Sequence, residues 1–239
     1  GVGLLSNVTG TRGDVEIWRQ VATERNVPLL LDASQAGGHM PMDVQELGCD
    51  FLAFSGHKVC GPSGIGVLWG RREWLERMVP PLLGGGMVHE SRMDGYTVKE
   101  VPWCFEAGTP NVEGAMGLAA ALEFMESVGM SNVEAHSKAL GRRLYDGVKN
   151  NPCLKLVARE SPERYGIVSF LVDIPGLSAE AFGRIMADTY GIMLSAGKHC
   201  THPYHDLLGF SATVRASTHV YTTEDEVDRF LEAVKQITG

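Results

Sequence analysis

The 239-residue sequence lacks the features that mark several special classes of protein. Its longest uncharged runs, 59–70 and 78–89, are too short to cross a membrane, and Gly and Pro interrupt both. No cluster of five or more Lys and Arg residues occurs, and 21 basic against 29 acidic residues leave a net charge of −8. Since nucleic acids are bound through basic surfaces, we expect no nucleic-acid partner. Because no uncharged run is long enough to cross a bilayer, we expect no membrane partner either.

Cysteines are few, and their spacing argues against disulfide bonds. The five lie at positions 49, 60, 104, 153 and 200, an odd number without a Cys-x-x-Cys pair. We therefore expect reduced thiols, in the cytoplasm or in an equivalent reducing compartment such as an organelle matrix. The sequence also lacks a signal-peptide pattern and an initial Met, and it opens directly on an apolar segment. This opening leads us to expect that something belongs in front of the chain.

The composition is that of a globular protein, with 44% apolar and 21% charged residues. In the first 70 residues the apolar pattern alternates between strands and helices, which predicts an α/β fold with a parallel sheet covered on both faces. Polar side chains follow the expected strands at their carboxyl ends, where such sheets bind ligands. The expected strands are 4–8, 28–32, 51–54 and 65–69, and the expected helices are 14–26 and 44–47.

The second half of the sequence predicts a smaller α+β domain. Residues 78–112 are rich in Gly and Pro and are expected to form loops with short strands. We place the domain boundary after them, which gives domains 1–112 and 113–239. The final helix is expected to begin at Thr223, with Glu226 completing a capping box. The other expected elements are helices 114–128, 132–150 and 178–190 and strands 154–157, 167–172, 192–194 and 213–217.

Lys58 and Asp32 are the first candidates for chemistry, because each stands at the end of an expected buried strand. A lysine in an apolar site can serve as a Schiff-base nucleophile, although on position alone a solvated lysine or a salt bridge is the more common explanation. Asp32 alone fits a salt bridge, a metal ligand or a partner for a ring nitrogen. Pyridoxal phosphate (PLP) needs a lysine for its aldehyde and commonly an acid at its pyridinium nitrogen. Together, Lys58 and Asp32 are consistent with a site for this cofactor.

Cys200 lies in a polar segment that also contains Lys198, His199 and His202. Positive groups of this kind would favour the thiolate, whereas most free cysteines are simply small buried residues. A metal site that combines Cys200 with His199, His202 and His205 is an alternative, but the spacing of a structural zinc site is missing. We therefore predict no metal.

Arg215 falls within an expected short strand. A buried arginine usually has a carboxylate partner. That partner is either an internal acid or the carboxylate of an amino-acid substrate, which a guanidinium holds through two hydrogen bonds.

In combination, these segments resemble the cysteine desulfurases of the class V aminotransferase group, which are fold-type I PLP enzymes. The Suf type is the nearer likeness, and the resemblance extends over essentially all 239 residues. Any one of the motifs would be a weak signal, but their joint occurrence in this order is highly specific. The matching segments are Asp32-Ala-Ser-Gln35, Ser55-Gly-His-Lys58, Phe105-Glu-Ala-Gly-Thr-Pro-Asn111, His199-Cys200 and Arg215.

The resemblance implies a PLP site built from residues of the large domain, whose C-terminal part would be residues 1–112. Lys58 would bind the cofactor covalently and then move protons at the substrate's α-carbon. The family is dimeric with shared sites, so a homodimer is implied. The other implied cofactor contacts are Asp32 to the pyridinium nitrogen, Gln35 to the ring hydroxyl oxygen, Ser55 and His57 to the phosphate, Asn7 beside the ring, and Thr109 to the phosphate in the neighbouring subunit.

For the substrate, the resemblance implies L-cysteine, which is converted to L-alanine. Arg215 would bind the α-carboxylate, and Cys200 would attack the sulfur and become a persulfide. An acceptor protein would then take the sulfur for iron–sulfur cluster assembly. The alternatives are a selenocysteine lyase, another class V aminotransferase, or a non-catalytic subunit or fragment that needs a partner chain.

Two departures from the family pattern stand out. The family often has an arginine five residues before the reactive cysteine, and this sequence has Ser195 there. The chain also begins where the family's large domain is already about half built. We therefore expect either that the sequence is a portion of a longer protein or that a separate chain supplies the N-terminal half.

Overall fold

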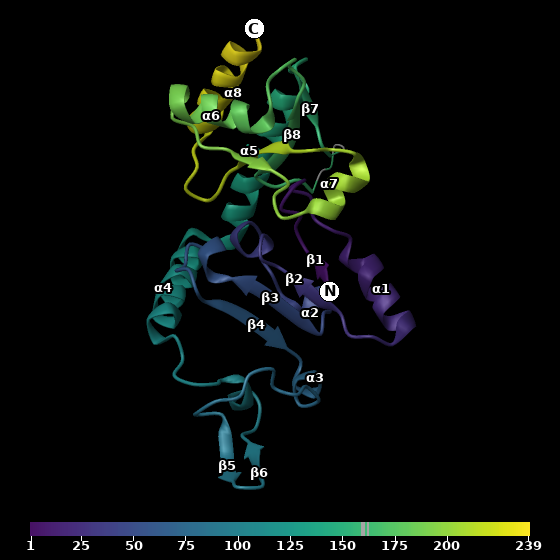
Figure 1. Cartoon of the computed structure of the whole chain (residues 1–239), viewed down its shortest axis with the longest axis vertical. Coiled ribbons are helices and arrows are strands. Elements are labelled where there is room, and N and C mark those ends of the chain that lie inside the picture. The colour runs from purple at the N-terminus through teal and green to yellow at the C-terminus, as the bar shows by residue number, and fades with distance from the viewer. Residues whose placement is uncertain (159–160, 162) are drawn as a thin grey trace. The chain divides into compact units, whose positions relative to one another are not determined.

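The computed structural model describes residues 1–158, 161 and 163–239 (Figure 1). It divides into two compact units, and each unit is built from segments that are not contiguous in sequence. This division differs from the domains expected at 1–112 and 113–239, whose boundary stays a prediction. The first unit comprises Gly1–Val2, Asp14–Ser34 and Met42–Ser127, and the second comprises Gly3–Gly13, Gln35–Pro41 and Val128–Gly239.

The first unit is organised around a four-stranded sheet of order β1-β2-β3-β4, with α1 and α4 flanking it (Figure 1). Strands β2 and β3 are parallel, as expected, but β3 and β4 are antiparallel, so the sheet is mixed. The direction of β4 differs from that of the mainly parallel sheet expected here, because the short connection 56–65 returns the chain directly beside β3 and leaves no room for a crossover helix. The elements are β1 (Val2–Gly3), β2 (Leu30–Asp32), β3 (Phe51–Ser55), β4 (Gly66–Gly70), α1 (Val15–Arg25), α2 (Val44–Leu47), α3 (Arg72–Leu75) and α4 (Val112–Val128).

Helix α1 illustrates how local sequence sets the ends of these elements. The Asp14 side chain accepts a hydrogen bond from the amide of Ile17, which satisfies one of the unpaired groups at the helix start. At the other end Asn26 adopts a left-handed conformation with φ of 49°, which suits asparagine. The helix expected over 14–26 is thus confirmed. Residues 78–112 contain, as expected, loops and a short hairpin of β5 (Val88–Arg92) and β6 (Gly95–Val98).

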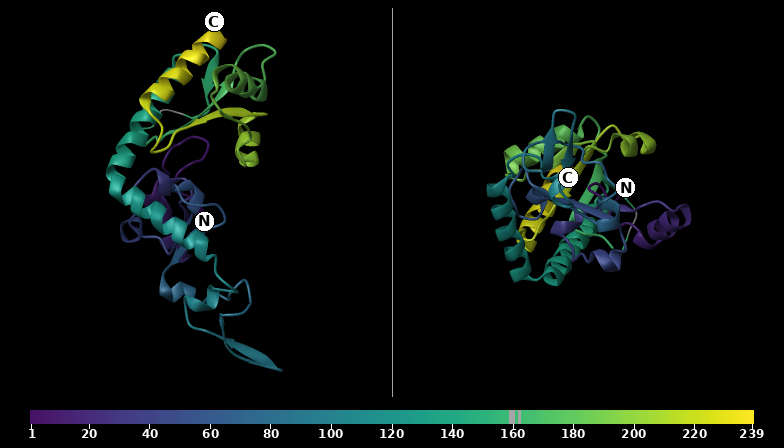
Figure 2. Two further views of the ribbon diagram at one scale, coloured as in Figure 1. Left: turned by 90° about the vertical axis from the view of Figure 1, so that its left-hand side faces the viewer. Right: turned by 90° about the horizontal axis from the view of Figure 1, so that it is seen from below.

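The second unit contains an antiparallel sheet of order β7-β8-β10-β9 with helices α5, α6 and α8 packed on one face. Helices α5 and α8 lie side by side (Figure 2). Their apolar residues form one core with those of α6 and of the two central strands, around Phe170 and Phe182. The elements are β7 (Leu154–Leu156), β8 (Ile167–Val172), β9 (Ser195–Gly197), β10 (Thr213–Ser217), α5 (Met130–Lys149), α6 (Ala179–Tyr190), α7 (His202–Leu208) and α8 (Glu224–Thr238).

Three expectations for the second unit need correction. Residues 4–8 do not form a strand, because the Ser6 hydroxyl accepts hydrogen bonds from the amides of Val8 and Thr9 and turns the chain. Residues 192–194 are not a strand either, since the amide of Ile192 still bonds to the end of α6. Helix α7 was not expected; it begins with a proline in its first turn and ends at the left-handed Gly209.

Among the described residues, no helix is both long enough and apolar enough to span a membrane.

Candidate active site

A polar row crosses the sheet of the second unit on the face opposite its apolar core. In β10 the side chains alternate, so Val214 and Ala216 enter the core while Arg215 points to the other face. The register places Arg215 directly opposite Ser195 of β9 and Ser169 of β8. Residues facing each other in antiparallel strands share a face. The alternation of buried apolar and polar residues in 213–217 thus builds a polar surface around one arginine.

Arg215 is held only in part by the chain itself. Its Nη1 donates a hydrogen bond to the backbone oxygen of Asn7, 3.0 Å away. Its Nε is buried and, within the described part of the chain, has no hydrogen-bond partner. Burial lowers the pKa of the guanidinium, and nearby Cys200 partly offsets this. A buried donor without a partner is costly, so this atom is suited to an incoming acceptor such as a carboxylate.

Cys200 is exposed and lies in loop 198–201, whose other residues are half-buried beside the polar row. His199 and Cys200 both have left-handed backbones, with φ of 49° and 61°, a conformation that costs energy for residues other than glycine. The Nδ2 of Asn7 donates to the backbone oxygen of His199 at 2.9 Å. Three expected site residues from distant segments, Asn7, Cys200 and Arg215, are therefore brought together in the second unit.

The His199 ring lies inside a hydrogen-bonded cluster. Its Nδ1 is 3.3 Å from Ser195 Oγ, and its Nε2 is 3.0 Å from Thr213 Oγ1. Burial, followed by the charges of Arg215 and His205, lowers the pKa of His199 to about 4. His199 is therefore neutral at pH 7 and supplies no positive charge. The expectation that His199 favours a Cys200 thiolate by its charge is wrong for this reason.

Lys198 is likewise engaged, through an ion pair of its Nζ with Asp206 at 2.5 Å. This pairing further reduces the positive charge that the sequence led us to expect around Cys200. The alternative metal site also receives no support from the arrangement: in the described part of the chain, no group of three or more His, Cys, Asp or Glu is placed to hold a metal ion.

The expected cofactor contacts of the first unit gather at one edge of its sheet. Asp32 ends β2, and Ser55 ends the neighbouring parallel strand β3, so both lie at the carboxyl edge. His57 and Lys58 follow immediately in the 3₁₀ turn η2 (Gly56–Lys58). One oxygen of Asp32 accepts a hydrogen bond from the amide of Ser34 at 2.9 Å, and the residue is otherwise exposed. The edge thus presents a carboxylate, a hydroxyl, an imidazole and an amine.

Two further candidates lie outside these groups. Thr109 is exposed and follows Gly108, whose amide bonds to the backbone oxygen of Gly85 at 2.7 Å. This bond holds segment 106–111 against the glycine-rich segment 84–86. Gln35 belongs to the second unit, where it precedes the 3₁₀ turn η1 (Ala36–Gly38).

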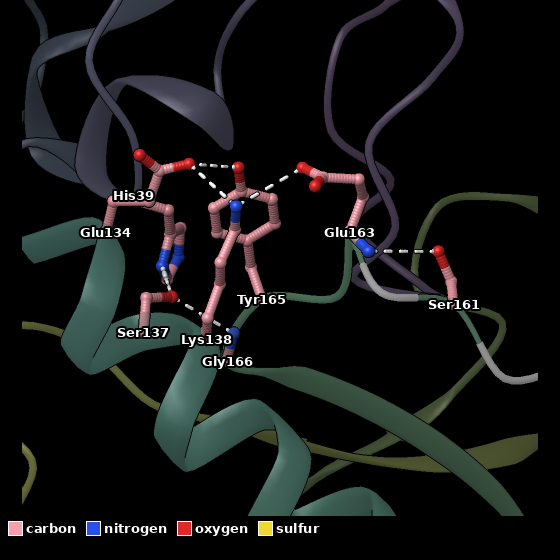
Figure 3. A network of polar contacts seen from close by, with 8 residues as sticks. All are labelled: His39, Glu134, Ser137, Lys138, Ser161, Glu163, Tyr165 and Gly166. Carbon is pink, nitrogen blue, oxygen red and sulfur yellow. Dashed lines mark hydrogen bonds and ion pairs between the residues drawn. The ribbon is translucent and has the colours of Figure 1, made fainter. Parts of the chain in front are cut away.

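The segment that begins with Gln35 is anchored by a buried polar network (Figure 3). His39 Nδ1 lies 2.8 Å from Ser137 Oγ on α5, and the same oxygen accepts from the amide of Gly166 at 3.1 Å. Burial, followed by the charge of His219, lowers the pKa of His39 to about 4. The network therefore ties segment 35–41 to α5 and to the start of β8.

A second group in Figure 3 fixes Glu163 and Tyr165, which precede β8. The Tyr165 hydroxyl donates to Glu134 at 2.7 Å, and Lys138 bridges Glu134 and Glu163 at 3.0 and 3.3 Å. Burial and then the hydrogen bond with Glu134 raise the pKa of Tyr165. These contacts position the strand that faces Arg215.

Sequence reasoning missed Thr213 and considered His205 only as a metal ligand. Both are completely buried, and His205 Nε2 lies 3.0 Å from Thr213 Oγ1. One signal was available for Thr213: it stands two positions before Arg215 in a strand and must share its face. No local pattern pointed to His205, because its contact with Thr213 depends on how α7 packs beside β10.

The chain matches the family of class V aminotransferases over residues 2–230. It is 37% identical to a cysteine desulfurase of Haloferax volcanii over 230 residues, 96% of this chain and 53% of that protein. Among solved structures, the apo cysteine desulfurase of Thermococcus onnurineus NA1 is 38% identical with a TM-score of 0.93, covering 99% of this chain and 58% of that one. The cysteine desulfurase CsdA of Escherichia coli, in its S-sulfonic acid form, is 40% identical with a TM-score of 0.91, covering 98% and 57%.

These likenesses confirm the expected fold class, an α/β fold shared with the cysteine desulfurases. The chain spans little more than half the length of the relatives and structures that it matches.

Proposed function

Because the chain belongs to the class V aminotransferase family, we propose that the protein containing it is a PLP-dependent cysteine desulfurase. The reaction converts L-cysteine to L-alanine and leaves a persulfide on Cys200. The observation that carries the proposal is the pairing of an exposed cysteine on a strained loop with Arg215, whose buried Nε has no partner in the described part of the chain. A reactive thiol and a receptor for an α-carboxylate are what an enzyme acting on cysteine needs.

The donor set of the first unit fits the cofactor. Asp32 offers a carboxylate for a pyridinium nitrogen, Ser55 and His57 offer donors for a phosphate, and Lys58 offers an amine for an aldehyde. We assign the remaining cofactor contacts to Asn7, Gln35 and Thr109, the last toward the partner subunit of a homodimer. PLP supplies, when bound, a sink for the electron pairs released at the substrate's carbon atoms.

The roles of this chain's residues in the reaction follow from their chemistry. Arg215 binds and orients the α-carboxylate of L-cysteine through its guanidinium fork. Lys58 moves the proton at the α-carbon. The Cys200 thiolate forms a bond to the substrate sulfur as the carbon–sulfur bond breaks, and a proton delivered to the β-carbon completes alanine. Exposure of Cys200 leaves the persulfide open to an acceptor protein.

The finer assignments belong to the same proposal. We assign the protein to the Suf type, on the motifs around Lys58 and Cys200, although CsdA is among the similar proteins. Its acceptor would use the sulfur for iron–sulfur cluster assembly in the cytoplasm or another reducing compartment. Selenocysteine is the alternative substrate, since Cys200 can accept selenium through the same contacts.

The test uses the natural protein that contains this chain, with PLP, L-cysteine and three variants. We expect an absorbance change on adding L-cysteine, formation of alanine, and a persulfide on Cys200 detected by mass spectrometry. Lys58→Ala should abolish the absorbance change. Cys200→Ser should keep the absorbance change but lose at least 100-fold in alanine formation.

Cys60→Ser is the matched control for Cys200→Ser, because Cys60 is also exposed and also has a positive φ, of 64°. Equal alanine formation by the Cys200→Ser and Cys60→Ser proteins would refute the role of Cys200. It would favour another class V activity, such as an aminotransferase. A parallel assay with selenocysteine decides between the two substrates.

A further inference from the structure

The loop that carries Cys200 is held by a chain of polar contacts that the proposed reaction does not by itself require. Starting at β9, the contacts run from Ser195 to His199, then to Thr213 of β10, and then to His205 of α7. The ring of His205 continues to the backbone oxygen of Thr201, 3.1 Å from its Nδ1. Thr213 and His205 have no exposed surface at all.

The direction of these hydrogen bonds follows from which atoms can donate. The backbone oxygen of Thr201 only accepts, and the Thr201 hydroxyl, 3.2 Å from the same nitrogen, donates its one hydrogen to the backbone oxygen of Lys198, so His205 Nδ1 carries a proton. When the ring holds that single proton, its Nε2 accepts from the Thr213 hydroxyl at 3.0 Å, a shorter contact than the 3.5 Å from that hydroxyl to its other acceptor, the backbone oxygen of Gly197. That hydroxyl has one hydrogen, so the other imidazole at 3.0 Å, His199 Nε2, must donate to it.

The same reasoning fixes the tautomer of His199. With its proton on Nε2, its Nδ1 accepts from the Ser195 hydroxyl at 3.3 Å. Every hydrogen bond in the chain then has one donor and one acceptor. The His199 ring is thereby hydrogen-bonded to Ser195 of β9 and to Thr213 of β10, and its backbone oxygen accepts a hydrogen bond from Asn7.

These hydrogen bonds matter because the backbones of His199 and Cys200 both have positive φ angles, in the left-handed region. Such backbones persist only where the surroundings over-determine them. A second set of contacts closes the loop: both the amide and the hydroxyl of Thr201 bond to the backbone oxygen of Lys198, at 2.8 and 2.7 Å. Removing the Thr213 hydroxyl would leave the bonds between Thr201 and Lys198 intact but would remove the hydrogen bond to the His199 ring, next to Cys200.

We propose that Thr213 and His205 are positioning residues, which set the direction of the Cys200 side chain through His199. The catalytic meaning of this inference rests on the proposed desulfurase activity, whereas the control of the loop does not. Thr213 and His205 touch no reacting atom. They stabilise the strained backbone from which the cysteine must reach its target.

The test compares Thr213→Val, which removes the hydroxyl at constant shape, with Thr213→Ser, which keeps it, in the natural protein loaded with PLP. Three quantities are measured: amide hydrogen exchange of the peptide containing 198–201, the absorbance change with L-cysteine, and the single-turnover rate of persulfide formation on Cys200. For Thr213→Val we expect at least 10-fold faster exchange in that peptide, an unchanged absorbance response, and at least 10-fold slower persulfide formation. Thr213→Ser should stay within about threefold of the unmodified protein in all three.

His205 provides a second pair of variants should Thr213→Val fail to fold. Glutamine places its amide near Nε2 and keeps a hydrogen bond to Thr213, while asparagine reaches only the position of Nδ1. We therefore expect His205→Asn to behave as Thr213→Val and His205→Gln to stay closer to the unmodified protein.

Either of two results would overturn the proposal: loop exchange equal in Thr213→Val and Thr213→Ser, or faster exchange with no loss of persulfide rate. An unmodified protein that shows no response to L-cysteine would refute the proposed function instead. In that case the hydrogen-exchange comparison still decides whether Thr213 and His205 hold the loop.

Discussion

At the scale of single residues, the Nε of Arg215, which has no hydrogen-bond partner among residues 1–158, 161 and 163–239, leads to a prediction about substrate binding. Lysine at this position would keep the positive charge but lose the planar fork that binds a carboxylate through two hydrogen bonds. We expect Arg215→Lys to raise the KM for L-cysteine at least 10-fold and to change kcat less. Steady-state alanine formation measures both quantities, and a KM equal to that of the unmodified protein would contradict a role in carboxylate binding.

Buried histidines make stability depend on pH. The pKa of His39 falls to about 4 in the folded protein, from 6.5 in an unfolded chain. As the pH falls from about 6.5 to 4, the unfolded state takes up a proton that the folded state does not, so the free energy of unfolding decreases. For His39 the decrease amounts to about 3 kcal/mol. Half-buried His199 acts in the same direction.

Urea unfolding at a series of pH values measures this loss of stability. In His39→Asn the dependence between pH 6.5 and 4 should become distinctly shallower, because the titrating ring is gone. The same slope in both proteins would show that His39 is not kept neutral by its burial.

Residue identity along the chain was sufficient to select the candidates for chemistry, but not their surroundings. Cys200 and Arg215 were selected from their residue types and Asn7 from the family resemblance, and the structure brings the three together. The expectation of positive charge around Cys200 was wrong because that charge depends on the burial of His199 and on the ion pair of Lys198. Burial keeps His199 neutral and Asp206 forms an ion pair with Lys198, and neither could be predicted from the residues next to Cys200.

At the scale of elements, helix caps and alternating patterns were predictable because they depend on neighbours in sequence. Strand 213–217 and helix α8 occur as expected, the latter with its capping box. The errors lie where side chains compete with the backbone, as Ser6 does, or where a helix end extends over residues of strand-like composition, as at Ile192. Strand β4 was expected over 65–69 and is present, but its antiparallel direction was not predicted, because apolar runs do not reveal strand direction.

Helix α8 offers a direct test of a local contribution to stability. The Thr223 hydroxyl accepts from the amide of Glu226, and the Glu226 carboxylate accepts from the amide of Thr223. Thr223→Ala should lower the free energy of unfolding by about 1 kcal/mol. Thr223→Ser keeps the cap and serves as the control. Chemical denaturation compares the two, and equal midpoints would show that the cap adds nothing measurable.

At the scale of the whole molecule, the division into two units was not predictable from sequence. The expected domains follow the order of the chain, whereas each compact unit collects separate segments. Which segments join depends on tertiary contacts such as the hydrogen bond from Ser169 Oγ to the backbone oxygen of Val8, at 2.6 Å. Composition on either side of a boundary carries no information about such contacts.

Two glycines of the second unit test how tightly segment 3–13 packs on β8. Gly10 and Gly176 both have positive φ, of 66° and 80°, but an added Cβ would lie 2.1 Å from the backbone oxygen of Ile167 at Gly10 and would meet nothing at Gly176. Gly176→Ala should therefore cost about 1 kcal/mol from backbone strain alone. Gly10→Ala should cost at least about 3 kcal/mol, since strain and a backbone clash add.

Urea unfolding measures both costs, and hydrogen exchange of segment 3–13 shows whether it detaches. Equal destabilisation by the two substitutions would mean that segment 3–13 does not lie against β8 as described.

The second unit is assembled from segments that lie far apart in the sequence, and this limits the order in which it can fold. Asn7 bonds to residues 192 and 208 positions away in sequence, so the loop to be closed is almost the whole chain. Closing long loops before contacts compensate for the lost entropy slows folding. During synthesis, residues 3–13 emerge long before β10 exists, and they must wait for it. Residues 3–13 are therefore synthesised long before they reach their native contacts, and until then they are open to chaperones and proteases.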